Sequence, residues 1–213
     1  MSTMIQQRAV TSLPMTSQRD HDFDLLQRIA RKDKRALEEM YLAYYRRIFQ
    51  FVFRMVHKQE VAEEIVNDVM FVVWQQAKSF KGQSKPSTWL LGIAYRKSLK
   101  ALRSSKRDST RTMVNEEAIV NTPDSNSASY PESSYADAEF SEDLKTGLDS
   151  LSEQHRSVVA LTALGHSYVE IAKIVDCPVN TVKTRMFYAR RQLKQILTEM
   201  HTDPVTQQDG QSI

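Results

Sequence analysis

A run of polar side chains at residues 180–184 has the residue types that contact DNA at the front of a recognition helix. Asn180, Thr181, Lys183 and Thr184 can donate hydrogen bonds to phosphate oxygens and to base edges. Further basic residues follow in the same segment: Arg185, Arg190, Arg191 and Lys194. The pattern favours DNA binding, although most pairs of amphipathic helices with a basic solvated face bind no DNA.

The elements that would position this run form two helices joined by a tight turn, over residues 166–197. Ser167 precedes the first helix and Glu170 follows three residues later, which is the pattern of a capping box. The turn contains Pro178, which cannot extend the first helix but suits the start of the next. One side of the second helix is apolar: Val182, Met186, Ala189, Leu193 and Leu197. This outline predicts a helix-turn-helix whose second helix enters the major groove.

The composition and the distribution of charge suggest a helical chain with two nucleic-acid-facing modules. The 213 residues include only 5 Gly and 6 Pro, and the net charge is +3. Residues 96–111 carry seven basic side chains and one acid, whereas residues 115–143 carry eight acids and no Lys or Arg. Residues 176–197 are again basic. Two basic zones that flank an acidic one indicate two modules and a solvated connector.

We expect a soluble protein of the cytoplasm. Cys177 is the single cysteine, so an internal disulfide is excluded and a reducing compartment fits; we expect this side chain to be a small buried filler. The polar N-terminus predicts no signal peptide. The longest apolar run, residues 69–74, is too short to span a bilayer, so no direct membrane insertion is expected.

Helical periodicity divides the front half into four helices. They are expected at residues 24–31, 35–57 and 61–78, and then from a cap at Ser87 or Thr88 to about residue 103. Residues 69–74 could also be read as a buried strand; helix is preferred because polar helix formers continue on both sides.

Periodicity stops between residues 104 and 140 and resumes behind them. A further helix is predicted after Ser152 as its cap, ahead of the helix-turn-helix. The predicted fold is all-α, with two small helical domains joined by a flexible acidic linker. The predicted boundaries are 1–21 for a disordered tail, 22–104 and 140–199 for the domains, 105–139 for the linker and 200–213 for a tail.

In these segments the chain resembles bacterial RNA polymerase sigma factors, specifically the extracytoplasmic-function group of the sigma-70 family. The sigma-two domain of that group is similar to ALEEMYLAYYRRIFQFVFRMV, VAEEIVNDVMFVVW and FKGQSKPSTWLLGIAYRKSLKALR. Its sigma-four domain is similar to LSEQHRSVVALTALGHSYVEIAKIVDCPVNTVKTRMFYARRQL. The resemblance covers roughly residues 22–103 and 140–198, in the order and spacing of the family. It implies an alternative sigma factor, which is not itself an enzyme.

The resemblance implies core RNA polymerase and promoter DNA as partners. The VAEEIVND helix corresponds to the surface that docks on the clamp helices of the largest polymerase subunit, through Glu63, Glu64, Asn67 and Asp68. By itself this pattern would be an ordinary solvated face. The family is commonly held inactive by an anti-sigma factor, often membrane-bound and released under stress, so such a partner is expected.

The loop behind that helix and the fourth helix correspond to the part that opens the minus-ten element and captures an unstacked base. The implied DNA-binding residues are Phe80, Lys81, Ser84, Lys85, Trp89, Arg96, Lys97 and Lys100. Stacking on an aromatic side chain contributes about 1–3 kcal/mol per base. For Trp89, a plain core position is the favoured alternative.

The helix-turn-helix corresponds to the reader of the minus-thirty-five element. Lys183, Thr184, Phe187 and Tyr188 match family positions near base edges, and Asn180, Thr181 and Arg185 match backbone contacts. Phe187 and Tyr188 could instead be packing residues, with nearly equal weight.

The chain departs from the family pattern at several positions. Leu-Pro is usual where this chain has Leu151-Ser152, and Gly is common where it has Asp176. Arg-Asn is common at the positions of Tyr95-Arg96, and an acid at Lys100, which leaves the minus-ten preference open. In the family the linker runs toward the active-site cleft of the polymerase, so its acidic charge could mimic nucleic acid.

Two other classes of function compete with this interpretation. One is a polymerase-independent regulator that uses the helix-turn-helix as a dimer. The other is an enzyme, for which Glu63, Glu64 and Asp68 could hold a metal, or His155, His166 and Cys177 could bind zinc. The two histidines and the cysteine include no pair that is close in sequence, and the three carboxylates lack a histidine partner. We therefore expect no metal, no cofactor and no small-molecule substrate.

Overall fold

The computed structural model describes residues 15–113 and 142–201, and these residues form two helical modules. The N-terminal module (residues 15–113) contains α1 (Met15–Ala30), α2 (Lys34–Val56), α3 (Gln59–Gln76), a short 3-10 helix η1 (Ala77–Ser79) and α4 (Pro86–Met113). The C-terminal module (residues 142–201) contains α5 (Glu142–Ser150), α6 (Glu153–Ala163), α7 (Tyr168–Ile174) and α8 (Val179–His201). The described residues include no strand, which confirms the predicted all-α fold.

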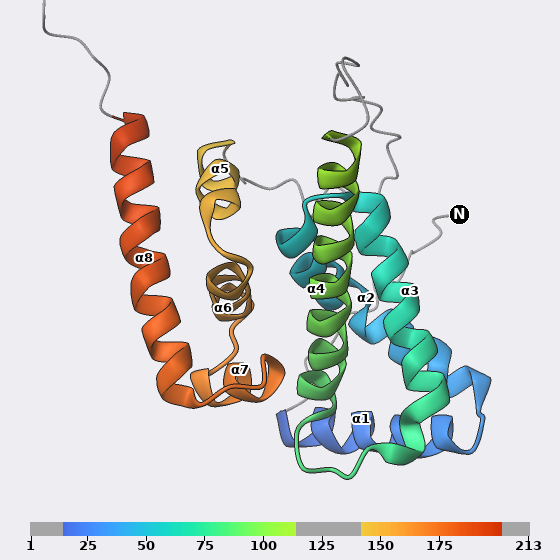
Figure 1. Cartoon of the computed structure of the whole chain (residues 1–213). Helices are drawn as coiled ribbons and strands as arrows, with labels where there is room; N and C mark the ends of the chain where they lie inside the picture. The colour runs from blue at the N-terminus through green and yellow to red at the C-terminus, as the bar shows by residue number, and fades with distance from the viewer. Residues whose placement is uncertain (1–14, 114–141, 202–213) are drawn as a thin grey trace, which may run out of the picture.

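The helices of the N-terminal module pack around the apolar side of α2. Asp33 caps α2, because its carboxylate accepts hydrogen bonds from the backbone N–H groups of Arg35 at 2.9 Å and Ala36 at 3.3 Å. The buried side of α2 has the predicted helical spacing. In Figure 1, α1 crosses one end of the upright helices α3 and α4. Residues 69–74 lie within α3, so the prediction of helix rather than strand is confirmed.

Three boundaries in this module differ from the predictions. Helix α1 begins at Met15, inside the segment predicted as a disordered tail. Helix α4 begins at Pro86 instead of after a cap at Ser87 or Thr88, because proline suits a first helical turn, whose N–H groups lack acceptors anyway. It continues to Met113, ten residues beyond the predicted end, since neither Gly nor Pro interrupts residues 104–113. The predicted linker otherwise lies outside the described residues, as does most of each predicted tail.

The C-terminal module follows the predicted caps closely. The hydroxyl of Ser152 accepts a hydrogen bond from the backbone N–H of His155 at 3.3 Å. Ser167 and Glu170 form both bonds of the capping box at the start of α7. Asp176, with φ 52°, lies in the left-handed region in the turn between α7 and α8, a conformation that aspartate tolerates better than most residues. The turn therefore forms without the glycine that is common in the family.

The two modules lie directly against each other. Helices α5, α6 and α7 stand between α8 and α4 in Figure 1. One cluster of buried apolar side chains includes residues of both modules, among them Leu90 and Ile93 of α4 with Ile171 and Ile174 of α7. A smaller cluster joins Leu148 and Leu151 to Ala189 of α8. The larger of the two clusters is thus shared by the two modules.

Candidate nucleic-acid and polymerase interfaces

The front of α8 presents polar and aromatic side chains to solvent. Its start is fixed by the N–H groups of Thr181 and Val182, which donate to the carbonyl oxygen of Pro178 at 2.9 Å and 3.2 Å. Val182, Met186 and Ala189 are buried and hold the helix on its module. The side opposite to this apolar stripe is therefore left facing outward.

Phe187 and Tyr188 lie on this outward side. They are 63% and 50% exposed, and their rings meet edge to face with centroids 5.4 Å apart. Two adjacent exposed rings make a contiguous apolar patch, and patches rimmed by polar residues mark binding surfaces. The structure therefore excludes the alternative that these two residues are core packing residues.

The other predicted DNA-binding residues of α8 are either exposed to solvent or in contact with neighbouring residues. Asn180, Lys183 and Thr184 are exposed, Thr181 is half-buried, and the Thr184 hydroxyl donates to the carbonyl oxygen of Asn180 at 3.0 Å. Arg185 is half-buried, and its guanidinium lies 3.6 Å from the sulfur of Cys177. Cys177 is half-buried and packs against the shared apolar cluster, so it is a packing residue but not a fully buried one.

A hollow of about 410 Å³ runs along the same face. It is lined by apolar and basic side chains: Tyr168, Lys183, Met186, Phe187, Arg190, Arg191 and Lys194. Basic side chains around an apolar floor attract phosphate groups electrostatically while offering contact to bases or sugars. This surface has the composition of a nucleic-acid interface.

The second predicted DNA contact is the loop at residues 80–85 and the start of α4. Phe80 stacks at a tilt against Trp89, with ring centroids 5.2 Å apart, and against Phe23, with centroids 6.0 Å apart. Gly82, with φ 69°, turns the loop, and a methyl group at this position would approach the Phe23 ring to 3.3 Å. Phe80 and Trp89 are half-buried, so each ring keeps part of its surface open.

The sequence does not mark Phe23 as part of this ring cluster. It lies on α1, far from the loop in sequence, and it is 38% exposed. Its apolar position three residues before Leu26 gives the only sequence signal, and that signal indicates packing, not proximity to residues 80–85.

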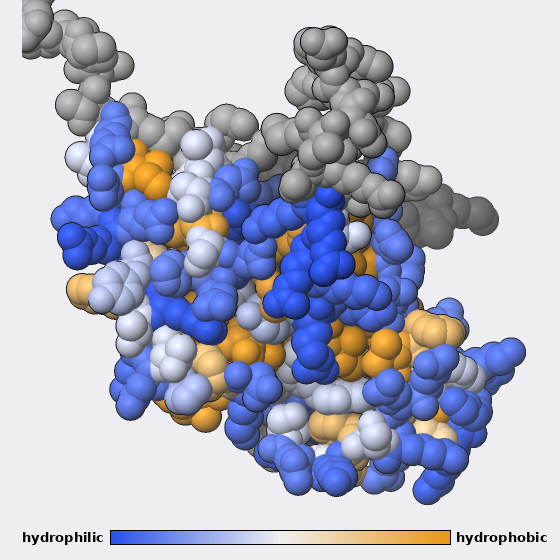
Figure 2. Space-filling model, viewed as in Figure 1, coloured by the Kyte–Doolittle hydropathy of each residue, from blue (hydrophilic) through white to orange (hydrophobic). Residues whose placement is uncertain are grey.

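The basic residues of this region differ in their exposure and in whether a carboxylate pairs with them. Lys81, Arg96 and Lys100 are exposed, and Ser84 is half-buried. Lys85 pairs with Glu170 of α7 at 2.7 Å, and Lys97 pairs with Asp68 of α3 at 2.7 Å. Figure 2 shows a continuous hydrophilic strip along the visible edge of α4, between apolar patches. The predicted set is thus gathered along one loop and one helix, but two of its cations have carboxylate partners.

Glu170 is held in its ionised form. Burial raises its pKa, but the hydrogen bonds from Lys85 and Ser167 and the charge of Lys85 outweigh burial and lower this pKa to about 2. The carboxylate therefore remains charged at neutral pH and attracts the Lys85 ammonium. It also lies 3.7 Å from Nδ1 of His166.

The predicted polymerase-binding residues share the outward side of α3. Ile65, Val66 and Val69 point into the core, and Glu63, Glu64, Asn67 and Asp68 lie at half-buried or exposed positions between them. The Asn67 side-chain oxygen accepts a hydrogen bond from the Tyr41 hydroxyl at 3.4 Å. Gln59 donates to Glu63 at 2.9 Å. The four side chains form one polar face of α3, with Asn67 beside α2 and Asp68 beside α4.

Rings on α2 extend along the edge of this face. Tyr41, Tyr45, Phe49 and Phe53 recur every fourth residue, with successive centroids 5.4–5.9 Å apart. Burial first, and then the charge of Glu63, raise the pKa of Tyr45. Only their spacing of four residues marks these rings in the sequence.

The competing metal sites are not formed in the part of the chain that the structure describes. Among residues 15–113 and 142–201, no three His, Cys, Asp or Glu side chains are grouped as metal ligands would be. Neither His155, His166 and Cys177 nor Glu63, Glu64 and Asp68 form such a group. No helix in the same residues combines the length and the apolar character that crossing a membrane requires.

Comparison with known proteins matches both modules to one family. Residues 40–108 match Sigma-70 region 2 and residues 141–193 match Sigma-70 region 4. RNA polymerase sigma factor YlaC of Bacillus subtilis is 31% identical over 79% of this chain and 95% of its own length. RNA polymerase sigma-H factor of Pseudomonas aeruginosa is 28% identical over 84% and 94%. The extracytoplasmic-function sigma-E factor of Escherichia coli is 29% identical over 78% and 88%.

Two solved structures share the fold. The sigma factor RpoE in complex with the anti-sigma factor NepR, from Bartonella quintana, has a TM-score of 0.58 and 25% identity, over 76% of this chain and 96% of that one. CnrH in complex with the cytosolic domain of CnrY has a TM-score of 0.61 and 19% identity, over 84% and 99%. The chain therefore belongs to the extracytoplasmic-function group of the sigma-70 family and is an alternative sigma factor, which directs transcription initiation by RNA polymerase from specific promoters.

Proposed function

We propose that the two modules divide the promoter between them. The C-terminal module reads the minus-thirty-five element with the front of α8, and the N-terminal module docks on core RNA polymerase and opens the minus-ten element. The exposure of Phe187 and Tyr188 beside Lys183 is the observation that supports this proposal best. A helix gains no stability from keeping two large rings in water, and such rings become useful when DNA covers them.

For the minus-thirty-five element, side chains on α8 act in two ways. Lys183 and Thr184 are exposed on the first two turns of α8, where a recognition helix meets base edges. Asn180 and Thr181 precede them and suit contacts to the phosphate backbone, which fix the register of the helix. Arg190, Arg191 and Lys194 extend the basic surface toward neighbouring phosphates.

For the minus-ten element, the ring cluster beside the loop provides the stacking surface. Extruding a base costs a few kcal/mol. A single aromatic face returns about 1–3 kcal/mol through stacking. Phe80 and Trp89 keep part of their rings open, and Lys81, Arg96 and Lys100 lie exposed nearby to attract the backbone. The contacts together can offset the cost of extrusion.

For polymerase docking, the polar face of α3 supplies the negative charge. Glu63, Glu64, Asn67 and Asp68 form a continuous surface that would meet basic side chains on the clamp of the polymerase. We expect Asp68→Arg to weaken binding to core polymerase about ten-fold, measured by fluorescence anisotropy of the labelled chain. Glu38→Arg, an exposed reversal on α2, is the control. Equal affinities for the two variants would remove Asp68 from the docking surface.

Further parts of the proposal concern partners and location. The RpoE structure contains an anti-sigma factor, and the CnrH structure contains the cytosolic domain of CnrY. We propose that this chain is likewise held inactive by an anti-sigma protein and released under stress. It works in the cytoplasm, where bacterial core polymerase meets promoter DNA, and it contributes recognition and melting while the polymerase performs the catalysis.

Run-off transcription tests the proposal as a whole. Core polymerase with this chain should produce transcripts from a subset of promoter fragments of the same genome, and core polymerase alone should not. No transcript from any fragment, together with no binding to core, would overturn the proposed function. Tight binding of the isolated chain to a palindromic site, without polymerase, would support a polymerase-independent regulator instead.

A further inference from the structure

Four basic side chains line the side of α4 that points away from the core. They recur at intervals of four, three and four residues, so they share one side of the helix: Arg96, Lys100, Arg103 and Arg107. All four are exposed. Leu91, Ala94 and Ser98, which are at most 1% exposed, have similar spacing on the opposite side, which faces the core. We call the four basic residues the α4 stripe, and Figure 2 shows the hydrophilic surface along this helix.

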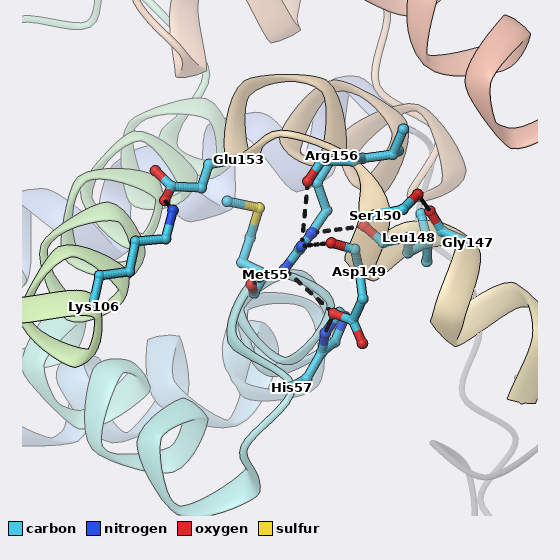
Figure 3. Close-up of polar contacts among 10 residues, drawn as sticks. Met55, His57, Lys106, Gly147, Leu148, Asp149, Ser150, Glu153 and Arg156 are labelled. Carbon is cyan, nitrogen blue, oxygen red and sulfur yellow. Dashed lines mark hydrogen bonds and ion pairs between the residues drawn. The ribbon is translucent and has the colours of Figure 1, made fainter. Parts of the chain in front are cut away.

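Neighbouring helices engage the basic residues on either flank of the α4 stripe. On one flank, Lys97 pairs with Asp68 of α3 at 2.7 Å. On the other flank, Lys106 pairs with Glu153 of α6 at 2.6 Å, beside the buried Arg156 (Figure 3). Within residues 15–113 and 142–201, no carboxylate pairs with a side chain of the α4 stripe itself. Its charges are therefore available to a partner from outside the chain.

The α4 stripe begins beside the proposed minus-ten reader and continues past it. Trp89, whose ring packs against Phe80, lies on the same side of α4 about two turns before Arg96. The residues predicted to touch the minus-ten element end at Lys100, whereas the stripe runs on to Arg107. Because α4 is one helix throughout, Arg107 is held about 27 Å beyond Trp89. No role has so far been given to this outer half of the stripe.

The composition of the α4 stripe suits duplex DNA better than single-stranded DNA. Proteins that hold single strands place aromatic rings beside basic side chains, so that unpaired bases can stack. Tyr95 is the single aromatic residue between positions 90 and 107, and it is buried. A duplex keeps its bases inside and offers its phosphates, which basic side chains bind without the help of rings.

The place of the stripe on α4 selects one stretch of the promoter. A base extruded beside Phe80 and Trp89 marks the edge of the melted DNA. Toward the minus-thirty-five element the DNA beyond this edge is still duplex, because a recognition helix such as α8 reads paired bases in the major groove. Arg96 and Arg107 are about 16 Å apart along the helix, which is the length of about five base pairs.

We propose that the α4 stripe is a further DNA-binding site, which holds the phosphate backbone of the duplex next to the minus-ten element, on its minus-thirty-five side. The site contacts about five base pairs and reads charge instead of sequence. Arg103 and Arg107 fix the last paired bases against α4 while the loop at residues 80–85 takes the first unpaired one. The position of the DNA in this site rests on the proposed function.

A forked promoter fragment, bound by core polymerase assembled with the full-length chain, tests this site. The fragment comes from a promoter that yields a run-off transcript, and its minus-ten element is single-stranded, so melting costs nothing. In a second, neutralised fork, uncharged methylphosphonate linkages replace the phosphates of the paired stretch that borders the element. The test variant is Arg103→Ala with Arg107→Ala. The control is Arg31→Ala with Arg35→Ala, two exposed arginines before and in the first turn of α2.

The test variant should bind the ordinary fork about ten-fold more weakly than wild type at about 0.1 M salt. The slope of log affinity against log salt should become shallower by about 1.8, since two phosphate contacts are lost. On the neutralised fork the test variant should bind like wild type, because the phosphates that the arginines would contact carry no charge. The control should bind both forks like wild type, and Arg103→Lys with Arg107→Lys should largely restore binding to the ordinary fork.

Three results would overturn the site while the proposed function stands. They are wild-type affinity of the test variant for the ordinary fork, an equal loss of affinity on the neutralised fork, and an equal loss on a single-stranded minus-ten oligonucleotide. The last result would place the two arginines on the unpaired strand. A failure of run-off transcription on every fragment would overturn the proposed function, and this site with it.

Discussion

The front of α8 and the loop at residues 80–85 are both proposed to read promoter DNA, yet they differ in how available they are. Phe187 is 63% exposed and Tyr188 is 50% exposed, and the basic side chains around them face solvent. The loop, in contrast, has Lys85 paired with Glu170 and the Gln83 carbonyl bound by Lys173. The front of α8 is therefore open, and the loop is partly occupied by contacts from the module that carries α8.

This difference suggests an order of events on the promoter. The front of α8 can meet duplex DNA with no change in the chain, whereas Lys85 must leave Glu170 before it can attract a phosphate group. Base stacking is needed only after melting begins. The following predictions test the contrast between the open and the covered surface, in order of decreasing effect.

Arg156→Ala is expected to have the largest effect, because it removes the anchor of the covered surface. The carbonyl groups of Leu148, Asp149, Leu151 and Met55 lose their shared donor, and buried acceptors without partners are costly. The free energy of unfolding should fall by about 3 kcal/mol in urea titrations. Arg191→Ala, an exposed change on α8, should stay within about 0.5 kcal/mol of wild type.

Lys183→Ala tests the open surface. Removing one exposed cation at the front of α8 should weaken binding of the holoenzyme to a fragment with the minus-thirty-five element by about 1 kcal/mol, or about five-fold. Electrophoretic mobility shifts with assembled holoenzyme measure it. Lys34→Ala, at an exposed lysine on α2, is the matched control and should bind like wild type. If both variants bind equally well, Lys183 does not read this element.

Glu170→Gln tests the loop at residues 80–85 by changing the α7 residue that pairs with Lys85. Glutamine can keep the capping box of α7 but removes the charge that holds Lys85. The free chain should then bind a single-stranded minus-ten oligonucleotide two- to three-fold more tightly, measured by fluorescence anisotropy. An increase for Glu38→Gln of similar size would show that the effect is one of net charge alone.

His166 should give the smallest effect, seen as a pH dependence. Burial first, and then the charges of Arg47 from α2 and of Lys85, lower the pKa of His166 against the opposing pull of Glu170. A histidine with a lowered pKa stabilises the folded form above pH 6.5, and this contribution is lost as the pH falls below 6.5 toward the lowered pKa. His166→Gln should reduce the difference in stability between pH 7.5 and pH 5.5, because glutamine does not titrate.

Thermal unfolding of wild type and His166→Gln at both pH values measures this contribution. Comparing the two proteins cancels the titration of all other groups, to the extent that they are independent of His166. An identical pH dependence in both proteins would show that His166 does not couple protonation to the stability of the fold.

The local structure of this chain could be predicted from sequence because it depends on residues that are close together in the sequence. Ser152, Ser167 and Glu170 form their caps with residues at most three positions away, so spacing alone identifies them. The apolar stripes of α2 and α8 follow the same logic. The long extension of α4 was missed because its polar residues have no apolar partner to mark them as helical.

The contacts between modules were not predictable in the same way. Arg156 and Met55 are 101 residues apart, and no local pattern relates a charged side chain to a distant carbonyl group. Lys85 and Lys97 read as DNA-facing cations, which their sequence neighbours favour, yet each has a carboxylate partner on another helix. Phe23 joins the ring cluster of the loop only through the packing of α1. Such pairings are determined by the fold as a whole.

Helix α4 also has a consequence for how the chain responds to its medium. Pro86, next to Lys85, and Lys106 lie 20 residues apart on this helix, which is about 30 Å along one stiff rod. Contacts at its two ends are individually weak but reinforce each other, since forming one holds the partner surfaces of the other at high effective concentration. Ions screen both ends together, with a Debye length of about 10 Å at 0.1 M salt. The contacts at both ends would thus weaken together as the intracellular ionic strength rises, so the sigma factor would respond cooperatively.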